Sequence, residues 1–221
     1  AAPRAAETPG VPESTAPLEH HTAEPGRPGE LPGAWPEGAG RRYRAAHEQA
    51  AHDLDLAISL VVGAPRAATS LAHLVDHRCA DPEGALVFAC LLHLVGHREA
   101  AQFWWQFAAG GGSRTAAFCL YLHHRCLAEF RDADHWRDQA ARLARGPRRR
   151  TTAAPGPHSF LLSDTVRRDL LRQCHRGRHP HLPPTVEAVI NRLPVTGDDE
   201  DFGEVPQPVS HLPAELARSR G

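Results

Sequence analysis

The sequence predicts an all-α protein: a short antiparallel helical array with about two recognisable repeat units, capping helices and disordered termini. Three observations predict it. Between residues 41 and 145, apolar residues recur at spacings of three and four, the period of a helix with one buried face. Glycine and proline interrupt this pattern at short intervals. A motif that contains tryptophan and alanine occurs twice within the same stretch.

The first half of this stretch is expected to form three helices. The first spans 41–62, where an apolar stripe continues until Gly63. The second begins at Pro65, because proline suits the first position of a helix. Asp81 is the expected capping residue of the third, which spans 83–95.

The second half is expected to form three more helices. The first spans 99–109 and ends at Gly110–Gly112, because glycine is a poor helix former and tolerates the left-handed conformation. Ser113 is the expected N-cap of the next helix, 114–129, whose first half is apolar on every side and should be enclosed. The last helix, 132–144, has a narrow apolar stripe.

Two of these helices share one motif. Ala101-x-x-Trp104-x-x-x-Ala108-Ala109 recurs 32 residues later as Ala133-x-x-Trp136-x-x-x-Ala140-Ala141, with one other helix in between. A period in the thirties with two helices per unit is typical of a helical solenoid. Over about Gly84–Leu143 the chain resembles the tetratricopeptide group, most closely its Sel-like branch. The residues that carry the resemblance are Ala101, Trp104, Trp105, Ala108, Ala109, Ala116, Ala117 and Leu120.

The regions outside this repeat domain, 41–145, differ in composition. Residues 1–40 are rich in proline, glycine and alanine and are expected to be disordered. Residues 146–162 form a linker that contains several helix breakers. Two short amphipathic helices are expected within 163–194; each is too short to be stable alone, so both should dock on the repeat. Residues 195–221 are expected to be an acidic disordered tail.

The resemblance implies a non-enzymatic scaffold for protein–protein interaction, with a regulatory or signalling role. A peptide or helix of a protein partner would bind in the groove of the repeat. Trp104 and Trp105 cannot share one helix face, so one should enter the core and the other should meet the next helix. The candidate partner-binding residues are Trp105, Tyr121, His124 and Trp136.

A nucleic-acid-associated regulator is the alternative hypothesis. Residues 142–178 hold ten arginines against two aspartates, and an acidic segment follows. Such a pattern can indicate phosphate contacts with self-inhibition. No aromatic interleaving or recognised DNA-binding motif accompanies the arginines, which favours a solvated face. The candidate nucleic-acid contacts are Arg148, Arg149, Arg150, Arg167, Arg168 and Arg172.

Composition indicates the kind of genome that encodes the protein and the cellular compartment in which we expect it. All 25 basic residues are arginine, which is typical of a G+C-rich genome such as that of an actinobacterium. The net charge of −1 implies no global attraction to nucleic acid or to an anionic membrane. The five cysteines include no C-x-x-C pair, which indicates free thiols in a reducing cytoplasm. No apolar run reaches the roughly 18 residues that a membrane span needs.

Histidine and cysteine are frequent enough to raise the question of a metal. Three groups offer ligands, but none has a known zinc-finger spacing, and Gly96 interrupts the first group. No serine elbow or cysteine-nucleophile signature occurs either, so we expect no metal, no cofactor and no catalytic residue. The three groups are Cys90, His93 and His97; His123, His124 and Cys126; and Cys174, His175, His179 and His181.

Overall fold

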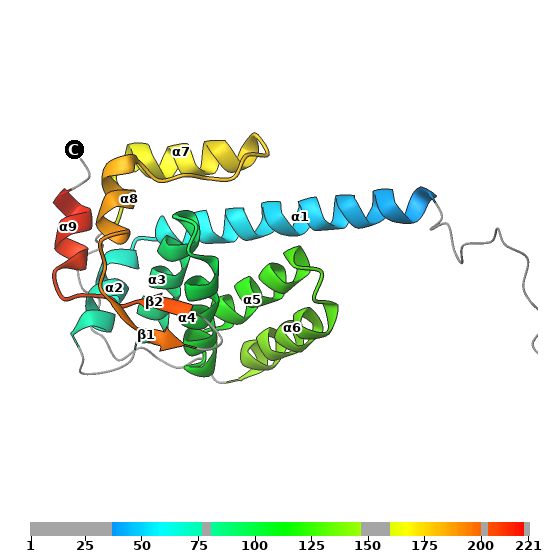
Figure 1. The fold of residues 1–221 in the computed structure, drawn as a ribbon, viewed down its shortest axis with the longest axis horizontal. Helices are drawn as coiled ribbons and strands as arrows, with labels where there is room; N and C mark the ends of the chain where they lie inside the picture. The colour runs from blue at the N-terminus through cyan, green and yellow to red at the C-terminus, as the bar shows by residue number, and fades with distance from the viewer. Residues whose placement is uncertain (1–36, 77–80, 147–159, 200–202, 219–221) are drawn as a thin grey trace, which may run out of the picture. The chain divides into compact units, whose positions relative to one another are not determined.

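The computed structural model describes residues 37–76, 81–146, 160–199 and 203–218, and the side chains of these residues except 37–43 and 196–203. The described chain is helical apart from one antiparallel pair of short strands, so the all-α prediction is confirmed (Figure 1). The elements are α1 (Glu37–Val62), α2 (Ala67–Val75), α3 (Pro82–Leu94), α4 (Arg98–Gly110), α5 (Arg114–Cys126), α6 (Phe130–Arg145), α7 (Asp164–His175), α8 (Pro184–Ile190), β1 (Val195–Asp199), β2 (Gly203–Pro206) and α9 (Leu212–Arg218).

Local signals in the sequence set several helix ends. The Asp81 carboxylate, the Ser113 hydroxyl and the Ser163 hydroxyl each accept a 3.4 Å hydrogen bond from a backbone N–H in the first turn of α3, α5 and α7. Gly96 and Gly112 have φ values of +91° and +100°, and they turn the chain between α3 and α4 and between α4 and α5. These signals act over a few residues, which is why the sequence predicted them.

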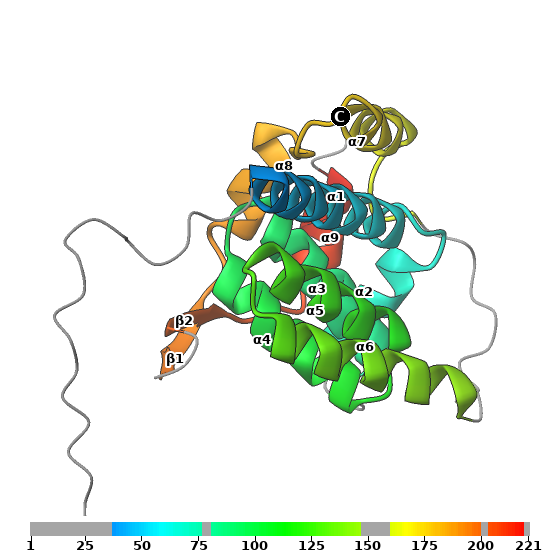
Figure 2. The same cartoon turned by 90° about the vertical axis from the view of Figure 1, so that its right-hand side faces the viewer.

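Consecutive helices pair as antiparallel hairpins. α3 packs on α4 and α5 packs on α6, and each pair is joined by a short connection (Figures 1 and 2). α1 lies across both hairpins and contacts α3 and α5 (Figure 2). α1 therefore covers one side of both α3 and α5. A regular superhelical step between the two hairpins stays a prediction.

The two copies of the tryptophan motif differ in how far they are buried. Ala101 and Ala133 are both fully buried at the start of the motif. Trp104 is 7% exposed and meets the Phe88 ring edge-on at 5.2 Å, whereas Trp136 is only half-buried. The difference follows from position: α4 packs between other elements, whereas α6 packs chiefly against α5.

α3 is the enclosed helix of the fold. Every residue from Gly84 to Leu94 is buried, because α1, α2 and α4 all pack against it. The sequence had favoured α5 as the enclosed helix, and this was wrong. The Phe118 side chain of α5 is 43% exposed, and Tyr121 is half-buried on the same face.

The C-terminal region departs from its prediction as a disordered tail, 195–221. β1 and β2 form an antiparallel pair in which Asp198 and Asp199 of β1 lie opposite Glu204 and Gly203 of β2, and α9 follows. Val205, Leu212 and Leu216 are 3%, 0% and 0% exposed and belong to the main core. The apolar residues here are few, but Leu212 and Leu216 lie four apart, so one face of α9 is buried.

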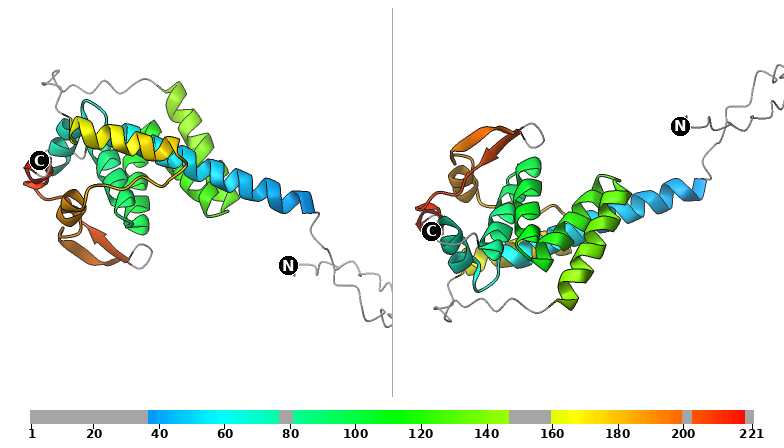
Figure 3. Two further views of the ribbon diagram at one scale, coloured as in Figure 1. Left: turned by 90° about the horizontal axis from the view of Figure 1, so that it is seen from above. Right: turned by 90° about the horizontal axis from the view of Figure 1, so that it is seen from below.

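The segment before the tail contains the two short helices expected there, and that both dock on the repeat stays a prediction. α7 lies along α1 (Figure 3), and Leu170 and Cys174 are fully buried there. Val186, Val189 and Ile190 of α8 are also buried. Of the predicted N-terminal segment 1–40 and linker 146–162, most residues lie outside the described part of the chain.

In the described part of the chain, no single helix combines the length and the apolar composition that crossing a bilayer requires. Residues 44–62 and 67–75 meet that test only when taken together, and they are bent by 78° relative to each other.

Candidate functional site

Trp105 was predicted to contact a partner, but the structure places it in the core. It is 0% exposed, and its ring contacts both His93 of α3 and His123 of α5, at centroid distances of 5.3 and 5.8 Å. Its neighbour Trp104 points the other way, and its Nε1 donates a 3.1 Å hydrogen bond to the carbonyl oxygen of Pro206. Both indoles are buried because α4 is covered by helices on one side and by β2 on the other.

His124 is also unavailable to a partner in this conformation. It is 5% exposed, and its Nδ1 lies 2.6 Å from Oε2 of Glu129 in the connection to α6. Its Nε2 is buried and has no hydrogen-bond partner among the described residues. Of the four predicted partner-binding residues, only Tyr121 and Trp136 reach the surface, and both are half-buried.

Tyr121 belongs to an exposed face that we call the α5 stripe: Phe118, Tyr121 and Arg125. These residues lie at i, i+3 and i+7, so they form one line along the helix. The rings of Phe118 and Tyr121 are 5.9 Å apart, and Nη1 of Arg125 donates a 3.4 Å hydrogen bond to the Tyr121 hydroxyl. Arg125 forms no ion pair with a carboxylate in the described part of the chain.

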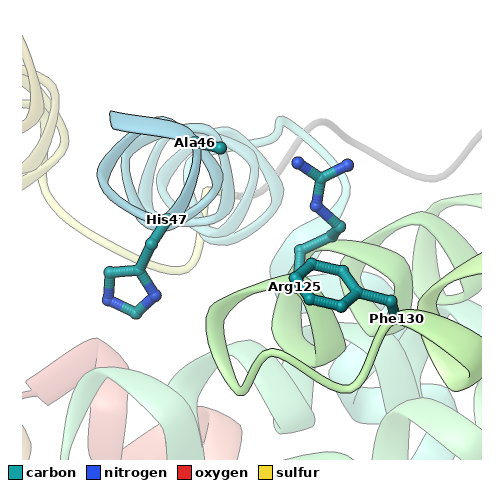
Figure 4. A pocket seen from close by; sticks show the side chains of 4 residues that line it. All are labelled: Ala46, His47, Arg125 and Phe130. Carbon is teal, nitrogen blue, oxygen red and sulfur yellow. The ribbon is translucent and has the colours of Figure 1, made fainter. Parts of the chain in front are cut away.

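A small hollow continues the α5 stripe towards α1. Figure 4 shows Ala46 and His47 on α1, and Arg125 and Phe130 across from them at the end of α5 and the start of α6. Phe130 is 47% exposed. Phe118, Arg125 and Phe130 were not predicted as contact residues, because their exposure depends on how α5 and α6 pack against their neighbours.

The arginines of the alternative hypothesis are paired where they are described. Arg168 and Arg172 lie 2.7 and 3.1 Å from carboxylate oxygens of Asp164 and Asp169 on α7 itself. Arg167 pairs with Asp164 at 2.8 Å, and its guanidinium stacks over the Phe160 ring at 3.6 Å. Neighbouring carboxylates thus offset the charge of α7. The other candidates, Arg148, Arg149 and Arg150, lie outside the described residues.

The structure brings together one group of potential metal ligands that was not predicted from the sequence. Asp55 of α1, His93 of α3 and His179 after α7 offer ligand atoms that all lie within 4.8 Å of one another. Asp55 is 8% and His93 5% exposed, and Oδ1 of Asp55 lies 2.8 Å from Nδ1 of His179. The predicted groups had separated His93 from His179 and had omitted Asp55.

Burial sets the protonation state of the histidines near this cluster. It lowers the pKa of His93 to about 3, with further contributions from His179, His123 and Arg98. Burial likewise lowers the pKa of His123 to about 4. Both imidazoles are therefore neutral near pH 7, which is the form that coordinates metals.

Of the predicted cysteine ligands, Cys90 and Cys174 are buried thiols and Cys126 is half-buried. Burial raises the pKa of Cys90, Cys126 and Cys174, that of Cys126 to about 11. Cys90, Cys119, Cys126 and Cys174 are all free thiols. A second group of potential ligands, His124, Glu129 and Asp132, has two exposed carboxylates, and His124 is already bonded to one of them.

No protein-family model matches this chain, and neither a curated protein nor a solved structure matches it. The likeness to the tetratricopeptide group therefore stays a resemblance carried by the residues of α4 and α5.

Proposed function

We propose that this protein is a non-enzymatic interaction protein that binds an amphipathic helix of a protein partner along the α5 stripe. The observation that carries the proposal is the exposure of large apolar side chains on and beside α5. Phe118, Leu127 and Phe130 are 43%, 47% and 47% exposed. The Phe118 ring also lies 5.9 Å from that of Tyr121, and neighbouring exposed apolar groups are typical of protein–protein interaction sites.

This location replaces the groove expected from the resemblance. In a two-helix repeat, the first helix of each unit lines the groove, and here those helices would be α3 and α5. Because α1 packs across both, a partner peptide has no access to that face. The α5 stripe lies on a face of α5 that its neighbours cover only in part, since Phe118 is exposed and Tyr121 and Arg125 are half-buried, and Tyr121 is the predicted contact residue on this face.

The chemistry of the stripe indicates what the partner carries. A helix that docks on Phe118 and Tyr121 would present apolar residues at i, i+3 or i+4, and i+7. Arg125 has no carboxylate partner in the described part of the chain, so an acidic residue on the partner helix would fit beside it. Aromatic and arginine side chains are the residues that most often dominate the binding energy of an interface.

A regulatory or signalling role in the cytoplasm is part of the proposal and rests on the resemblance. Free thiols at Cys90, Cys119, Cys126 and Cys174 fit a reducing compartment. We do not favour nucleic acid as the partner, because the described candidate contacts Arg167, Arg168 and Arg172 each pair with a carboxylate of α7.

The test compares the wild-type chain with two variants, each used as bait in extracts of cells that make the protein. One bait is Phe118→Ser with Arg125→Glu; the matched control is Arg131→Glu, an exposed change on α6. We expect proteins that the wild-type chain captures to be lost with the double variant and retained with the control. Light scattering of the purified chain distinguishes a second copy of this chain from another protein as the partner. An identical captured set for all three baits would overturn the proposal.

A further inference from the structure

Three segments far apart in the sequence bring a carboxylate and two imidazoles together. Asp55 comes from α1, His93 from α3 and His179 from the connection between α7 and α8. α1 packs against both α3 and α7, which places these segments side by side (Figures 1 and 3). A ring nitrogen of each histidine and a carboxylate oxygen of Asp55 all lie within 4.8 Å of one another.

Two of the three side chains in this cluster are buried, which distinguishes it from the exposed groups of acidic and histidine residues that are common on protein surfaces. Asp55 is 8% exposed and His93 is 5% exposed. Carboxylates are rarely this buried unless they are paired or coordinate a metal, because losing water disfavours the charge. In the described part of the chain, only His179 pairs with the Asp55 carboxylate in an ion pair, at 2.8 Å.

His93 supplies a second, independent observation. Its Nδ1 is buried and has no hydrogen-bond partner among the described residues. A buried polar atom without a partner is unfavourable, and each case in a folded protein requires an explanation. A neutral imidazole satisfies a ring nitrogen either by a hydrogen bond or by binding a metal ion.

We propose that Asp55, His93 and His179 bind one divalent ion of the zinc class. Two imidazoles and one carboxylate are a donor set that zinc accepts when a water or another small ligand completes the tetrahedron. With bonds of about 2.0–2.2 Å, ligand atoms of such a site lie about 3.4 Å apart, so the observed cluster needs only small side-chain movements. The ion would lie between the Asp55 carboxylate and the two imidazoles.

The positions of the three ligands indicate how the ion would reach the cluster and what it would stabilise. His179 is half-buried, so the ion reaches the cluster from the solvent side, while Asp55 and His93 hold it from within. Since each ligand comes from a different segment, the ion clamps the α7–α8 connection onto α1 and α3. The cluster shares no residue with the α5 stripe, so metal binding and partner binding can be tested independently.

The test uses the full chain, freed of metal with a chelator and then titrated with Co²⁺, whose visible spectrum reports tetrahedral coordination. We expect one Co²⁺ per chain, displacement by one Zn²⁺, and slower hydrogen exchange at 176–183 when the ion is bound. His179→Gln is the main variant because this side chain is half-buried and its loss leaves the core intact. It should weaken binding at least tenfold, and so should Asp55→Asn.

The matched control is His175→Gln, an exposed histidine of α7 that is not part of the cluster. It should bind Co²⁺ as the wild-type chain does. The proposal is overturned by the absence of stoichiometric binding at micromolar Co²⁺ or Zn²⁺. It is also overturned if His179→Gln and His175→Gln bind equally well, which would mean that surface histidines bind the ion. A loss of stability in Asp55→Asn without any metal binding would identify the cluster as an ion pair alone.

Discussion

Nε1 of Trp104 on α4 donates a 3.1 Å hydrogen bond to the carbonyl oxygen of Pro206, the last residue of β2. This bond joins the tryptophan of the repeated motif to a C-terminal hairpin that is 102 residues away in the sequence. It explains why Trp104 is more buried than Trp136, since α6 has no such strand beside it. The hairpin is thus part of the packing of α4.

Trp104→Phe should loosen the hairpin while leaving α4 in place. The phenyl ring keeps most of the contact with Phe88 but donates no hydrogen bond, so we expect a loss of about 1 kcal/mol in the free energy of unfolding. Hydrogen exchange should accelerate at 203–206 in particular. Trp136→Phe is the control, because no hydrogen bond of Trp136 is described. Equal exchange at 203–206 in both variants would contradict this assignment.

The contrast between the helices and the hairpin illustrates what the sequence could predict. The helices of 41–145 are predictable because apolar period, caps and glycines act within a few residues of one another. The hairpin was missed because Val205 is an isolated apolar residue in an acidic and proline-rich segment. The hairpin is bonded to Trp104 through Pro206, and nothing local in the sequence connects these two residues.

Gly84→Ala should destabilise the fold, although alanine favours a helix. A Cβ at this position would lie 2.2 Å from the backbone oxygen of Ser70 and 2.8 Å from Cβ of Leu74, so α2 would have to move away from α3. We expect the overpacking, roughly 1–3 kcal/mol, to exceed the gain in helix propensity of about 1 kcal/mol. The measurement is the midpoint of urea unfolding.

Gly110→Ala is the matched control for Gly84→Ala. Gly110 is also helical, but a Cβ there meets no atom within 4 Å. This substitution should be neutral or stabilise the protein by up to about 1 kcal/mol. If both substitutions shift the midpoint in the same direction by the same amount, the close approach of α2 and α3 does not decide the outcome.

The candidate sites were less predictable than the fold. Asp55 carries a signal that could have been used, because it lies three residues before Ile58 and seven before Val62 on the buried face of α1. A charged residue on an apolar stripe requires a partner. The identity of that partner, His179, depends on how α7 docks, and no local pattern encodes it. Conversely, Trp105 and His124 looked available because no local pattern shows that His93 and His123 pack on the Trp105 ring or that Glu129 pairs with His124.

Alkylation of Cys126 should show an alkaline pH profile. Burial, followed by the charge of Asp55, raises the pKa of this thiol to about 11, and only the thiolate reacts. Between the ordinary pKa of about 9 and pH 11 the folded protein therefore retains a proton that the unfolded chain has lost. The rate of iodoacetamide labelling, followed by peptide mass spectrometry, should have its midpoint near pH 11. In urea the same thiol should titrate near pH 9; a midpoint near 9 in the folded protein would contradict the burial argument.

Phe118→Ser and Phe88→Ala should differ sharply in their effect on stability. Phe88 is 0% exposed and meets the Trp104 ring, so its truncation leaves a cavity and should cost about 3–5 kcal/mol. Phe118 is 43% exposed and contacts mainly Tyr121, so its loss should change the free energy of unfolding by less than about 1 kcal/mol. Urea unfolding of both variants measures the difference. A large loss for Phe118→Ser would mean that the α5 stripe supports the fold rather than an interaction, because a side chain kept for a partner contributes little to the free chain.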